Sequence, residues 1–312
     1  MPNLQDIQQA AERIKPYAHR TPVLTNEGLN QRVGAQVYLK CENFQKVGAF
    51  KFRGACNAVY SLSDEEAARG VCTHSSGNHA QALALAARMR GIPAYIVMPN
   101  NAPSVKKNAV AGYGGQITFC EPTLEAREST LERIRLETGA NVVHPYNDER
   151  VIAGQGTAAL ELLSDVPDLD VIIAPVGGGG LLSGTVIAAK GIKPGIRVIA
   201  GEPEMADDAY RSLQAGHLLP SANPKTIADG LLTSLGSITF PIVRERVEQI
   251  ITVSEAGIVA AMKFVWERVK IVIEPSSAVA VGVLWEKKID LSGLKVGIIL
   301  SGGNVDLDKL PW

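Results

Sequence analysis

From Val71 onwards the chain alternates short apolar runs with longer segments whose apolar residues recur at helical spacing. Short runs rich in β-branched residues predict strands, and apolar residues three or four positions apart predict helices. Strands joined in this way by helices form parallel sheets through right-handed crossovers. The predicted strands are Gln36–Cys41, Val71–Thr73, Ala94–Met98, Gln116–Phe119, Asn141–His144, Val171–Val176, Arg197–Gly201, Gln249–Val253 and Val296–Leu300.

The alternation falls into two series, and the second begins with a helical pattern at Val151. Two α/β units are therefore expected, in keeping with roughly 150 residues per domain for a chain of 312 residues. Residues 216–236 are rich in Pro, Gly, Ser and Asn and predict an ordered surface connection. The predicted helices are Phe52–Leu62, Asn78–Met89, Ser104–Val110, Thr123–Thr138, Val151–Leu163, Leu181–Ala189, Asp207–Ala215, Glu255–Val269 and Ser276–Trp285.

Charge and hydropathy argue against several classes of partner. The formal net charge is -1 and charged residues make up 20% of the chain, so nucleic acid is not an expected partner. No stretch reaches the roughly 18 uninterrupted apolar residues of a membrane span, and residues 1–15 lack the apolar run of a secretory signal. A cytoplasmic protein without a membrane partner is expected, with its four scattered cysteines reduced.

The segment from Gly48 to Gly54 places Lys51 between two aromatic residues, Phe50 and Phe52, where a helical pattern begins. An ammonium group held against apolar surface loses hydration, which lowers its pKa and favours the neutral amine. A neutral amine can form a Schiff base or take up a proton. The alternative is a surface lysine whose stem lies along the rings while its head stays in water.

Four consecutive glycines, Gly177, Gly178, Gly179 and Gly180, follow an apolar strand and open a helix. Such a run leaves backbone N–H groups free to surround a phosphate, with the helix dipole adding to the attraction. The alternative is a flexible turn without a ligand.

The spacing of these glycines fits neither common nucleotide motif. The last glycine of a dinucleotide fingerprint would fall on Leu182 or Ser183, and a Walker loop would need lysine at Thr185. Glu202, at the end of the next strand, stands where a ribose-binding acid is expected. A nicotinamide-dependent oxidoreductase therefore stays open as an alternative.

Two further polar turns lie at strand ends. The turn from Ser75 to His79 connects a strand to a helix and suits a carboxylate, although a serine-rich helix cap is the alternative. Ser301 follows the last strand at its carboxyl end, where open α/β sheets bind ligands. Together with Lys51 and the four glycines, these turns combine an amine, two anion cradles and a hydroxyl.

Six motifs resemble the serine racemase and serine/threonine dehydratase family, whose members are pyridoxal-phosphate enzymes of the tryptophan-synthase-like fold (fold type II). The resemblance covers nearly the whole chain, and the order and number of the motifs make it specific. The motifs are Lys40–Gln45 with Phe50–Ala55, Ser75–His79, Ile152–Thr157, Gly177–Gly180, Thr226–Gly230 and Ser301–Asn304.

The resemblance implies a cofactor, pyridoxal 5'-phosphate, and a set of residues that bind it. Lys51 would carry it as an internal Schiff base, Phe50 would pack on its pyridine ring, and Asn78 would hydrogen-bond the ring hydroxyl. Gly177 to Gly180 would hold its phosphate. Ser301 would face the pyridine nitrogen; this neutral partner does not keep the ring protonated, which suits elimination or racemisation more than transamination.

The implied activity is an ammonia-lyase reaction, in which L-serine or L-threonine is dehydrated and deaminated to a 2-oxo acid and ammonia with Lys51 as the base. Ser76 stands where serine racemases supply a proton from the opposite face, so serine racemase activity is a second expected activity. The substrate carboxylate would bind the turn formed by Ser75, Ser76, Gly77, Asn78 and His79.

Arg127 matches a family arginine that approaches the distal end of a dicarboxylate. L-threo-3-hydroxyaspartate dehydratase is therefore the close alternative to a serine/threonine enzyme. Without that role, Arg127 is a surface arginine paired with Glu128 or Glu132 on its helix.

A divalent cation and the response to nucleotides are separate expectations. Glu202, the Ala206 carbonyl and Asp208 resemble the family's cation loop and would supply oxygen ligands to Mg²⁺, Ca²⁺ or Mn²⁺. The alternative is a solvated acidic helix start. Asn26 and Glu27 stand where mammalian members have serines that contact ATP, which argues against ATP activation.

The implied fold is a two-domain α/β enzyme with parallel-rich twisted sheets flanked by helices. A small domain, residues 67–145, would be inserted into a large cofactor-binding domain, residues 1–66 and 146–312, with the cofactor in the cleft between them. Closure of the small domain over the substrate and assembly into a homodimer are expected. A nonenzymatic protein that binds a phosphate ligand also stays open.

Overall fold

Two separate sheets organise the molecule in the computed structural model, which describes residues 1–75, 77–102 and 104–312. The larger sheet has six strands in the order β1-β2-β10-β7-β8-β9, and the smaller has four in the order β5-β4-β3-β6. Neighbouring strands run parallel except for the antiparallel β1–β2 pair. The strands are β1 Val23–Leu24, β2 Gln36–Cys41, β3 Val71–His74, β4 Ala94–Pro99, β5 Gln116–Cys120, β6 Asn141–Val142, β7 Val171–Pro175, β8 Arg197–Pro203, β9 Gln249–Val253 and β10 Lys295–Leu300.

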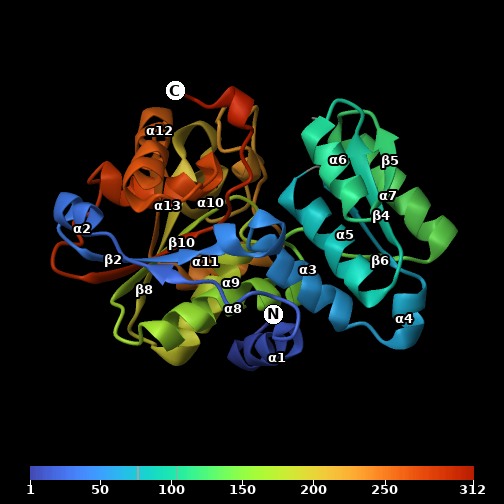
Figure 1. Ribbon diagram of the computed structural model, residues 1–312, viewed down its shortest axis with the longest axis horizontal. Coiled ribbons are helices and arrows are strands. Elements are labelled where there is room, and N and C mark those ends of the chain that lie inside the picture. The colour runs from blue at the N-terminus through green and yellow to red at the C-terminus, as the bar shows by residue number, and fades with distance from the viewer. Residues whose placement is uncertain (76, 103) are drawn as a thin grey trace.

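Helices cover both faces of the larger sheet, with α8 and α9 on one face and α12 and α13 on the other (Figure 1). A central parallel strand is then shielded on both sides, which is why β7 reads as an unbroken apolar run and all of its residues are buried. The helices of this part are α1 Leu4–Ile14, α2 Glu27–Val33, α3 Lys51–Tyr60, α8 Glu149–Asp165, α9 Gly180–Ile192, α10 Asp208–Ala215, α11 Thr239–Arg246, α12 Glu255–Phe264 and α13 Pro275–Trp285.

The smaller sheet lies to one side of the larger one, and α3 lies between the two (Figure 1). All its strands come from residues 71–142, and its helices are α4 Asp64–Ala68, α5 Asn78–Arg90, α6 Ser104–Gly112 and α7 Leu124–Thr138. Helix α3 packs against both α8 and α5. It therefore lies between the part of the molecule that contains the larger sheet, called the larger lobe below, and the part that contains the smaller sheet, called the smaller lobe. The division into domains at residues 67 and 145, and closure of the small domain, stay predictions.

Several elements differ from those predicted by the sequence patterns, and three of these differences have a clear local cause or form. Helix α11 was not expected, because Pro241 interrupts its pattern; the first turn of a helix tolerates proline. Strand β6 ends at Val142 instead of His144, since the His144 imidazole accepts a hydrogen bond from the Asn147 N–H at 2.9 Å and turns the chain. The predicted helix over 255–269 changes to a π-helix at Val265.

A buried network of charged groups fixes α3 to the large sheet. The Arg53 side chain is fully buried, and its guanidinium donates to Glu42 at 2.7 Å and to Glu161 on α8 at 2.8 Å. Lys40 on β2 is also fully buried and donates to Glu161 at 2.6 Å. Buried charges persist only when they are paired in this way. The network therefore holds the helix that begins at Lys51.

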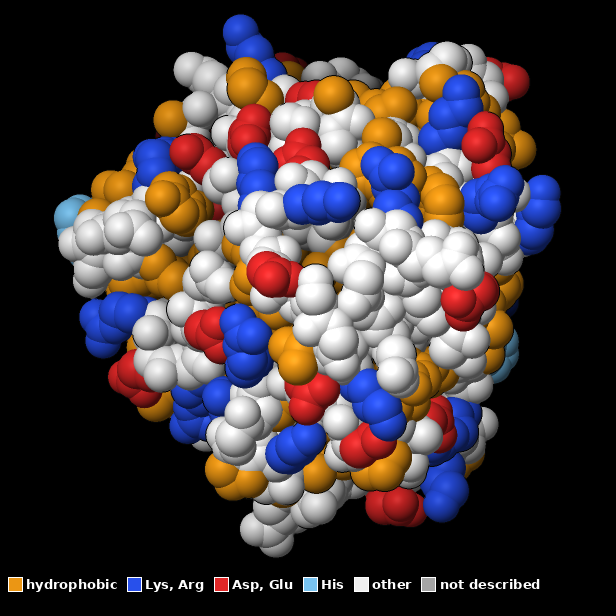
Figure 2. Space-filling model, turned by 90° about the vertical axis from the view of Figure 1, so that its left-hand side faces the viewer, with side chains coloured by type: hydrophobic (Ala, Val, Ile, Leu, Met, Phe, Trp, Pro, Cys, Tyr) orange, Lys and Arg blue, Asp and Glu red, His pale blue; other side chains and the backbone are white. Residues whose placement is uncertain are grey.

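Acidic and basic side chains are interspersed on the surface shown in Figure 2, without a continuous patch of one sign on that face. Among the described residues, no helix combines the length and the apolar character needed to cross a membrane.

Candidate active site

Lys51 is the first residue of α3, and its Nζ donates a hydrogen bond to the carbonyl oxygen of Pro145 at 2.8 Å. Burial lowers the pKa of Lys51 to about 8, and the negative charge of Glu274 acts in the opposite direction. A lysine with this pKa is substantially neutral under mildly alkaline conditions. It has the properties of an amine nucleophile and of a base.

The two aromatic neighbours of Lys51 lie in different places. The Phe50 ring is 5.2 Å from Lys51 Nζ, whereas the fully buried Phe52 ring packs in the core around α3 and faces Lys46 at 5.6 Å. The lysine is therefore not held between two rings, and Phe50 alone flanks it. The Phe50 N–H donates to the carbonyl oxygen of Ser301 at 3.0 Å, which ties the lysine turn to the end of β10.

The four glycines form a tight loop between β7 and α9. A Cβ added to Gly178 would lie 2.3 Å from the Tyr146 ring, and one added to Gly179 would lie 2.6 Å from Leu235. Gly179 also has φ of +85°, a conformation that favours glycine. Space and backbone geometry both require glycine here, and the absence of side chains leaves the backbone N–H groups open to a ligand.

The predicted carboxylate turn precedes α5, and one of its residues, Ser76, lies outside the described residues. The Ser75 Oγ accepts a hydrogen bond from the Gly77 N–H at 3.4 Å. His79 is buried, and its Nε2 donates to the carbonyl oxygen of Val143 at 3.0 Å. Burial lowers the pKa of His79 to about 3, so the ring is neutral. The His79 ring thus holds α5 to the residue after β6, while the first-turn N–H groups of α5 remain suited to an anion.

Asn78 and the segment that follows Ser301 come together through a buried carboxylate that sequence reasoning missed, Glu274. Asn78 Nδ2 donates to the two Glu274 carboxylate oxygens at 3.1 and 3.2 Å, and the Asn304 N–H donates to the same carboxylate at 3.1 Å. Asn304 Nδ2 donates in turn to Asn78 Oδ1 at 2.9 Å. Burial raises the pKa of Glu274 to about 7. The only signal in the sequence is an acid directly before Pro275, at the start of a helical pattern.

The rings of His74, His144 and Tyr146 pack near Lys51, whose charge acts on the pKa of His144. The ring of His144 is perpendicular to Tyr146 at 4.6 Å and to His74 at 6.1 Å. Burial lowers the pKa of His144 to about 4. Burial lowers the pKa of His74, and the positive charge of Arg127 on α7 acts in the same direction.

The side chain of Arg127 is not paired as the surface alternative requires. Its Nε is buried without a hydrogen-bond partner among the described residues, and Glu132 pairs with Arg135 instead. The hydrogen-bonding capacity of this nitrogen is therefore unused among the described residues.

The predicted cation ligands lie at the end of β8 and the start of α10. The Glu202 carboxylate accepts hydrogen bonds from the N–H groups of Ala209 at 2.8 Å and Tyr210 at 2.7 Å. Asp208 is 1% exposed, yet neither carboxylate oxygen has a partner among the described residues. The described residues contain no group of three or more His, Cys, Asp and Glu side chains placed to hold a metal ion, so a cation here would rely on carbonyl or water oxygens as well.

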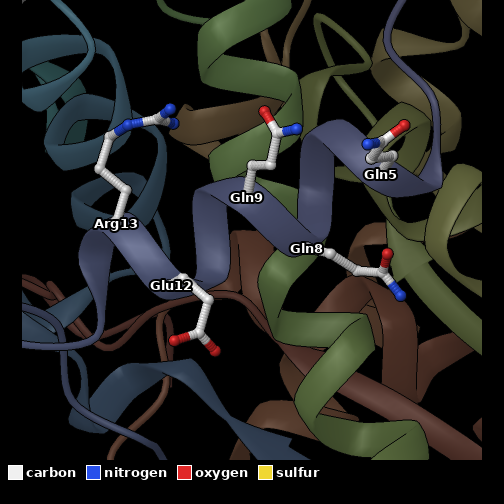
Figure 3. Close-up of a pocket in the computed structure, with 5 residues that line it drawn as sticks. All are labelled: Gln5, Gln8, Gln9, Glu12 and Arg13. Atoms are coloured by element: carbon white, nitrogen blue, oxygen red, sulfur yellow. The ribbon is translucent and has the colours of Figure 1, made fainter.

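The groove drawn in Figure 3 is a different feature. It lies on the outer side of α1, and none of the candidate residues lines it. Its lining consists of Gln5, Gln8, Gln9, Glu12 and Arg13.

Comparisons with known proteins point to one family. The family described as pyridoxal-phosphate dependent enzyme matches residues 14–302. The beta-hydroxyaspartate dehydratase of Paracoccus denitrificans is 54% identical over 100% of this chain and 99% of its own length. The solved serine racemase from Dictyostelium discoideum has a TM-score of 0.93 with 54% identity, covering 98% of this chain and 99% of that one. The solved T.th. threonine deaminase has a TM-score of 0.94 with 43% identity, covering 99% of this chain and 100% of that one.

Proposed function

Because the chain belongs to the pyridoxal-phosphate-dependent enzyme family, with a fold of type II, we propose that it deaminates small β-hydroxy amino acids by dehydration. The proposed substrates are L-serine and L-threonine, and serine racemisation is a second activity. The observation that carries the proposal is the pairing of a lysine of low pKa with a glycine loop shaped for a phosphate.

The residues present fit pyridoxal phosphate, since the N–H groups of Gly177 to Gly180 donate to no acceptor among the described residues and are left for a phosphate. Lys51 would bind the cofactor aldehyde, Phe50 its ring face, Asn78 its hydroxyl and Ser301 its ring nitrogen. When bound, the cofactor delocalises the electron pair that is left at the substrate Cα.

The proton transfers belong to the chain's own residues. Lys51 Nζ, held by the Pro145 carbonyl, takes the α-proton in its neutral form. The Ser75–His79 turn orients the substrate carboxylate. Return of a proton from the opposite face by Ser76 would racemise the amino acid. Loss of the β-hydroxyl as water would instead give an enamine, which a water molecule would hydrolyse to the 2-oxo acid and ammonia.

Covalent labelling tests the central assignment. The protein is mixed with pyridoxal phosphate, reduced with borohydride and analysed by peptide mass spectrometry. Wild type gains one pyridoxyl group on the peptide containing Lys51, and Lys51→Ala gains none. Lys46→Ala, a substitution at a neighbouring lysine, keeps the label. Labelling of Lys51→Ala to the wild-type extent would show that the assignment is wrong, and binding of hydroxy amino acids without turnover would favour a nonenzymatic binding protein.

L-threo-3-hydroxyaspartate is a second candidate substrate, favoured by the unpaired Arg127 Nε among the described residues. A guanidinium nitrogen free of intramolecular partners can bind a second carboxylate. A chiral assay of 2-oxo acid and D-amino acid formation from all three substrates separates the candidates. In Arg127→Gln, kcat/KM for hydroxyaspartate should fall by roughly tenfold or more, the range of one charge-assisted hydrogen bond, while that for L-serine stays within about twofold. An equal loss for both substrates would argue against this role.

A divalent cation at Glu202, the Ala206 carbonyl and Asp208 is proposed from the two buried Asp208 oxygens that lack partners among the described residues. Binding to the folded state alone raises the melting temperature as the ligand concentration exceeds its dissociation constant. We expect millimolar Mg²⁺ to raise the Tm of wild type, EDTA to reverse this, and Asp208→Asn to abolish the response. A Tm response of Asp208→Asn equal to that of wild type would place the cation elsewhere.

A further inference from the structure

Gln155, in the middle of α8, is a buried amide that the proposed function does not use. Its side chain is 0% exposed, and neither Oε1 nor Nε2 has a hydrogen-bond partner among the described residues. An amide group withdrawn from water without a partner costs free energy, so such groups are rare and call for an explanation. A ligand group that completes the hydrogen bonds provides one.

The position of the Gln155 amide is defined by two glycines. A Cβ added to Gly180 would lie 2.6 Å from Gln155 Oε1, and one added to Gly54 would lie 3.0 Å from Gln155 Cγ. Gly180 is the last of the four glycines and the first residue of α9, and Gly54 is in the first turn of α3 after Lys51. The amide therefore lies between the two helix starts that carry the glycine loop and the lysine.

The glycine loop itself supplies only backbone donors. Within the described part of the chain, the N–H groups of Gly177 to Leu182 donate to no protein acceptor, and the Gly179 cap of α9 has no side-chain bond. These N–H groups and the helix dipole favour an anion at this point. No lysine or arginine is among the residues in closest contact with the four glycine positions, which are Tyr146, Gln155, Gly230, Leu231, Leu235 and Thr239.

We propose that Gln155 is a phosphate-recognition residue, whose Nε2 donates to an oxygen of the cofactor phosphate held by Gly177–Gly180. This inference rests on the proposed function, because it assigns the phosphate of pyridoxal phosphate to the glycine loop. It explains why a fully buried amide is left without a partner within the described part of the chain. It also makes Gln155 the side-chain donor at a phosphate otherwise bound by neutral backbone dipoles.

Two substitutions and two aldehydes test the role. Gln155→Glu keeps the shape but replaces the donor by an acceptor and adds a negative charge, and Gln155→Met keeps similar length without any polar group. Binding of pyridoxal phosphate and of pyridoxal, which lacks the phosphate, is titrated by absorbance on apoprotein. The stabilisation of apoprotein by inorganic phosphate is followed by thermal unfolding.

In both variants, affinity for pyridoxal phosphate should fall by roughly ten- to a hundredfold, the range of a hydrogen bond to a charged group, while affinity for pyridoxal changes less than about twofold. Inorganic phosphate should raise the Tm of wild type more than that of either variant. Gln155→Met apoprotein should be at least as stable as wild type, since it buries no unpaired amide.

A purely structural role for Gln155 gives a different pattern. Gln155→Met would then lower the Tm of apoprotein and reduce the affinities for pyridoxal phosphate and pyridoxal by the same factor. The rise in Tm with inorganic phosphate would stay as in wild type, and that result overturns the inference. If wild type binds neither aldehyde, the proposed function fails. If wild type binds pyridoxal phosphate and the ratio of its two affinities is the same in the variants, only the role of Gln155 fails.

Discussion

At the scale of single residues, the reactivity of Lys51 is set by its neighbour Phe50 and by groups from two distant parts of the chain. Phe50 flanks its amine, the Pro145 carbonyl accepts its hydrogen bond, and Glu274 supplies a negative charge. Burial favours the neutral amine and the carboxylate favours the ammonium form, and burial has the larger effect. The pH dependence of the amine therefore reports on both.

The rate at which apoprotein captures pyridoxal phosphate should rise with pH and level off above about 8, where Lys51 becomes neutral. An ordinary lysine would level off near 10.5. Glu274→Gln removes the charge that holds the pKa up, so its midpoint should lie below that of wild type. Stopped-flow absorbance measures the rate, and the same reaction with N-acetyl-lysine corrects for the aldehyde's own titration. A wild-type midpoint close to that of an ordinary lysine, or a shift to higher pH in Glu274→Gln, would contradict this account.

Candidate residues that belong to a local pattern could be predicted from the sequence. Residues whose role depends on contacts with distant parts of the chain could not. The Gly177–Gly180 loop and Lys51 stand out because each is unusual within its own segment. Glu274 lies 196 positions from Asn78, whose side chain donates to it, and nothing near Glu274 in the sequence predicts that contact. The burial of the Gln155 amide likewise depends on three helices meeting, which a single sequence does not encode visibly.

At the scale of elements, α3 is held by charges and not only by apolar packing. The Arg53 guanidinium sits between Glu42 and Glu161, and Glu161 also accepts from Lys40. Removing Arg53 leaves the fully buried Glu42 carboxylate without its cation. The start of α3, and with it Lys51, depends on this network.

Arg53→Met should lower the free energy of unfolding by about 3–5 kcal/mol, the usual cost of breaking a buried ion pair from one side. Urea denaturation of apoprotein measures the loss. The double variant Arg53→Met, Glu42→Gln should recover part of it, because one of the stranded charges is gone. A single variant as stable as wild type would show that the network contributes little.

The glycine loop is the second element whose geometry can be tested directly. In Gly178→Ala, the new methyl group would lie 2.3 Å from the Tyr146 ring, so the ring or the loop must move. Overpacking of this kind costs about 1–3 kcal/mol and should also weaken pyridoxal phosphate binding. Gly195→Ala is the control, because nothing lies within 4 Å of the added Cβ. Thermal unfolding and cofactor titration should show a lower Tm and a lower affinity in Gly178→Ala than in Gly195→Ala. The same Tm and affinity in both variants would count against a tight loop.

Element type was more predictable than element boundaries. Strands β2 and β9 have the predicted limits, because polar residues or turn residues bound their apolar runs. Strand β1 is too short for a periodic pattern, and α11 carries a proline. The end of β6 depends on a hydrogen bond made by the His144 side chain, which no periodicity can reveal.

At the scale of the whole molecule, the two lobes are joined across the site by polar contacts. Asn78 of the smaller lobe binds Glu274 and Asn304 of the larger one. A second contact pairs Lys106 on α6 with Asp229, with 2.5 Å between Nζ and the carboxylate. The first contact is at the candidate cofactor site, whereas both side chains of the second are partly exposed. Neither Lys106 nor Asp229 is among the residues proposed to bind the cofactor, although the charges of both act on the pKa of Glu274.

An exposed ion pair contributes at most about 1 kcal/mol to stability. Reversing one charge should therefore change the equilibrium constant for separating the two lobes at this contact by no more than about fivefold. In Lys106→Asp, amide hydrogen exchange in α6 should accelerate by up to that factor. The exchanged pair Lys106→Asp, Asp229→Lys should restore the wild-type rate, because opposite charges then face each other again. Exchange in the buried strand β7 is the internal control and should not change. If the single and double variants exchange alike in α6, the pair of Lys106 and Asp229 does not hold the two lobes together.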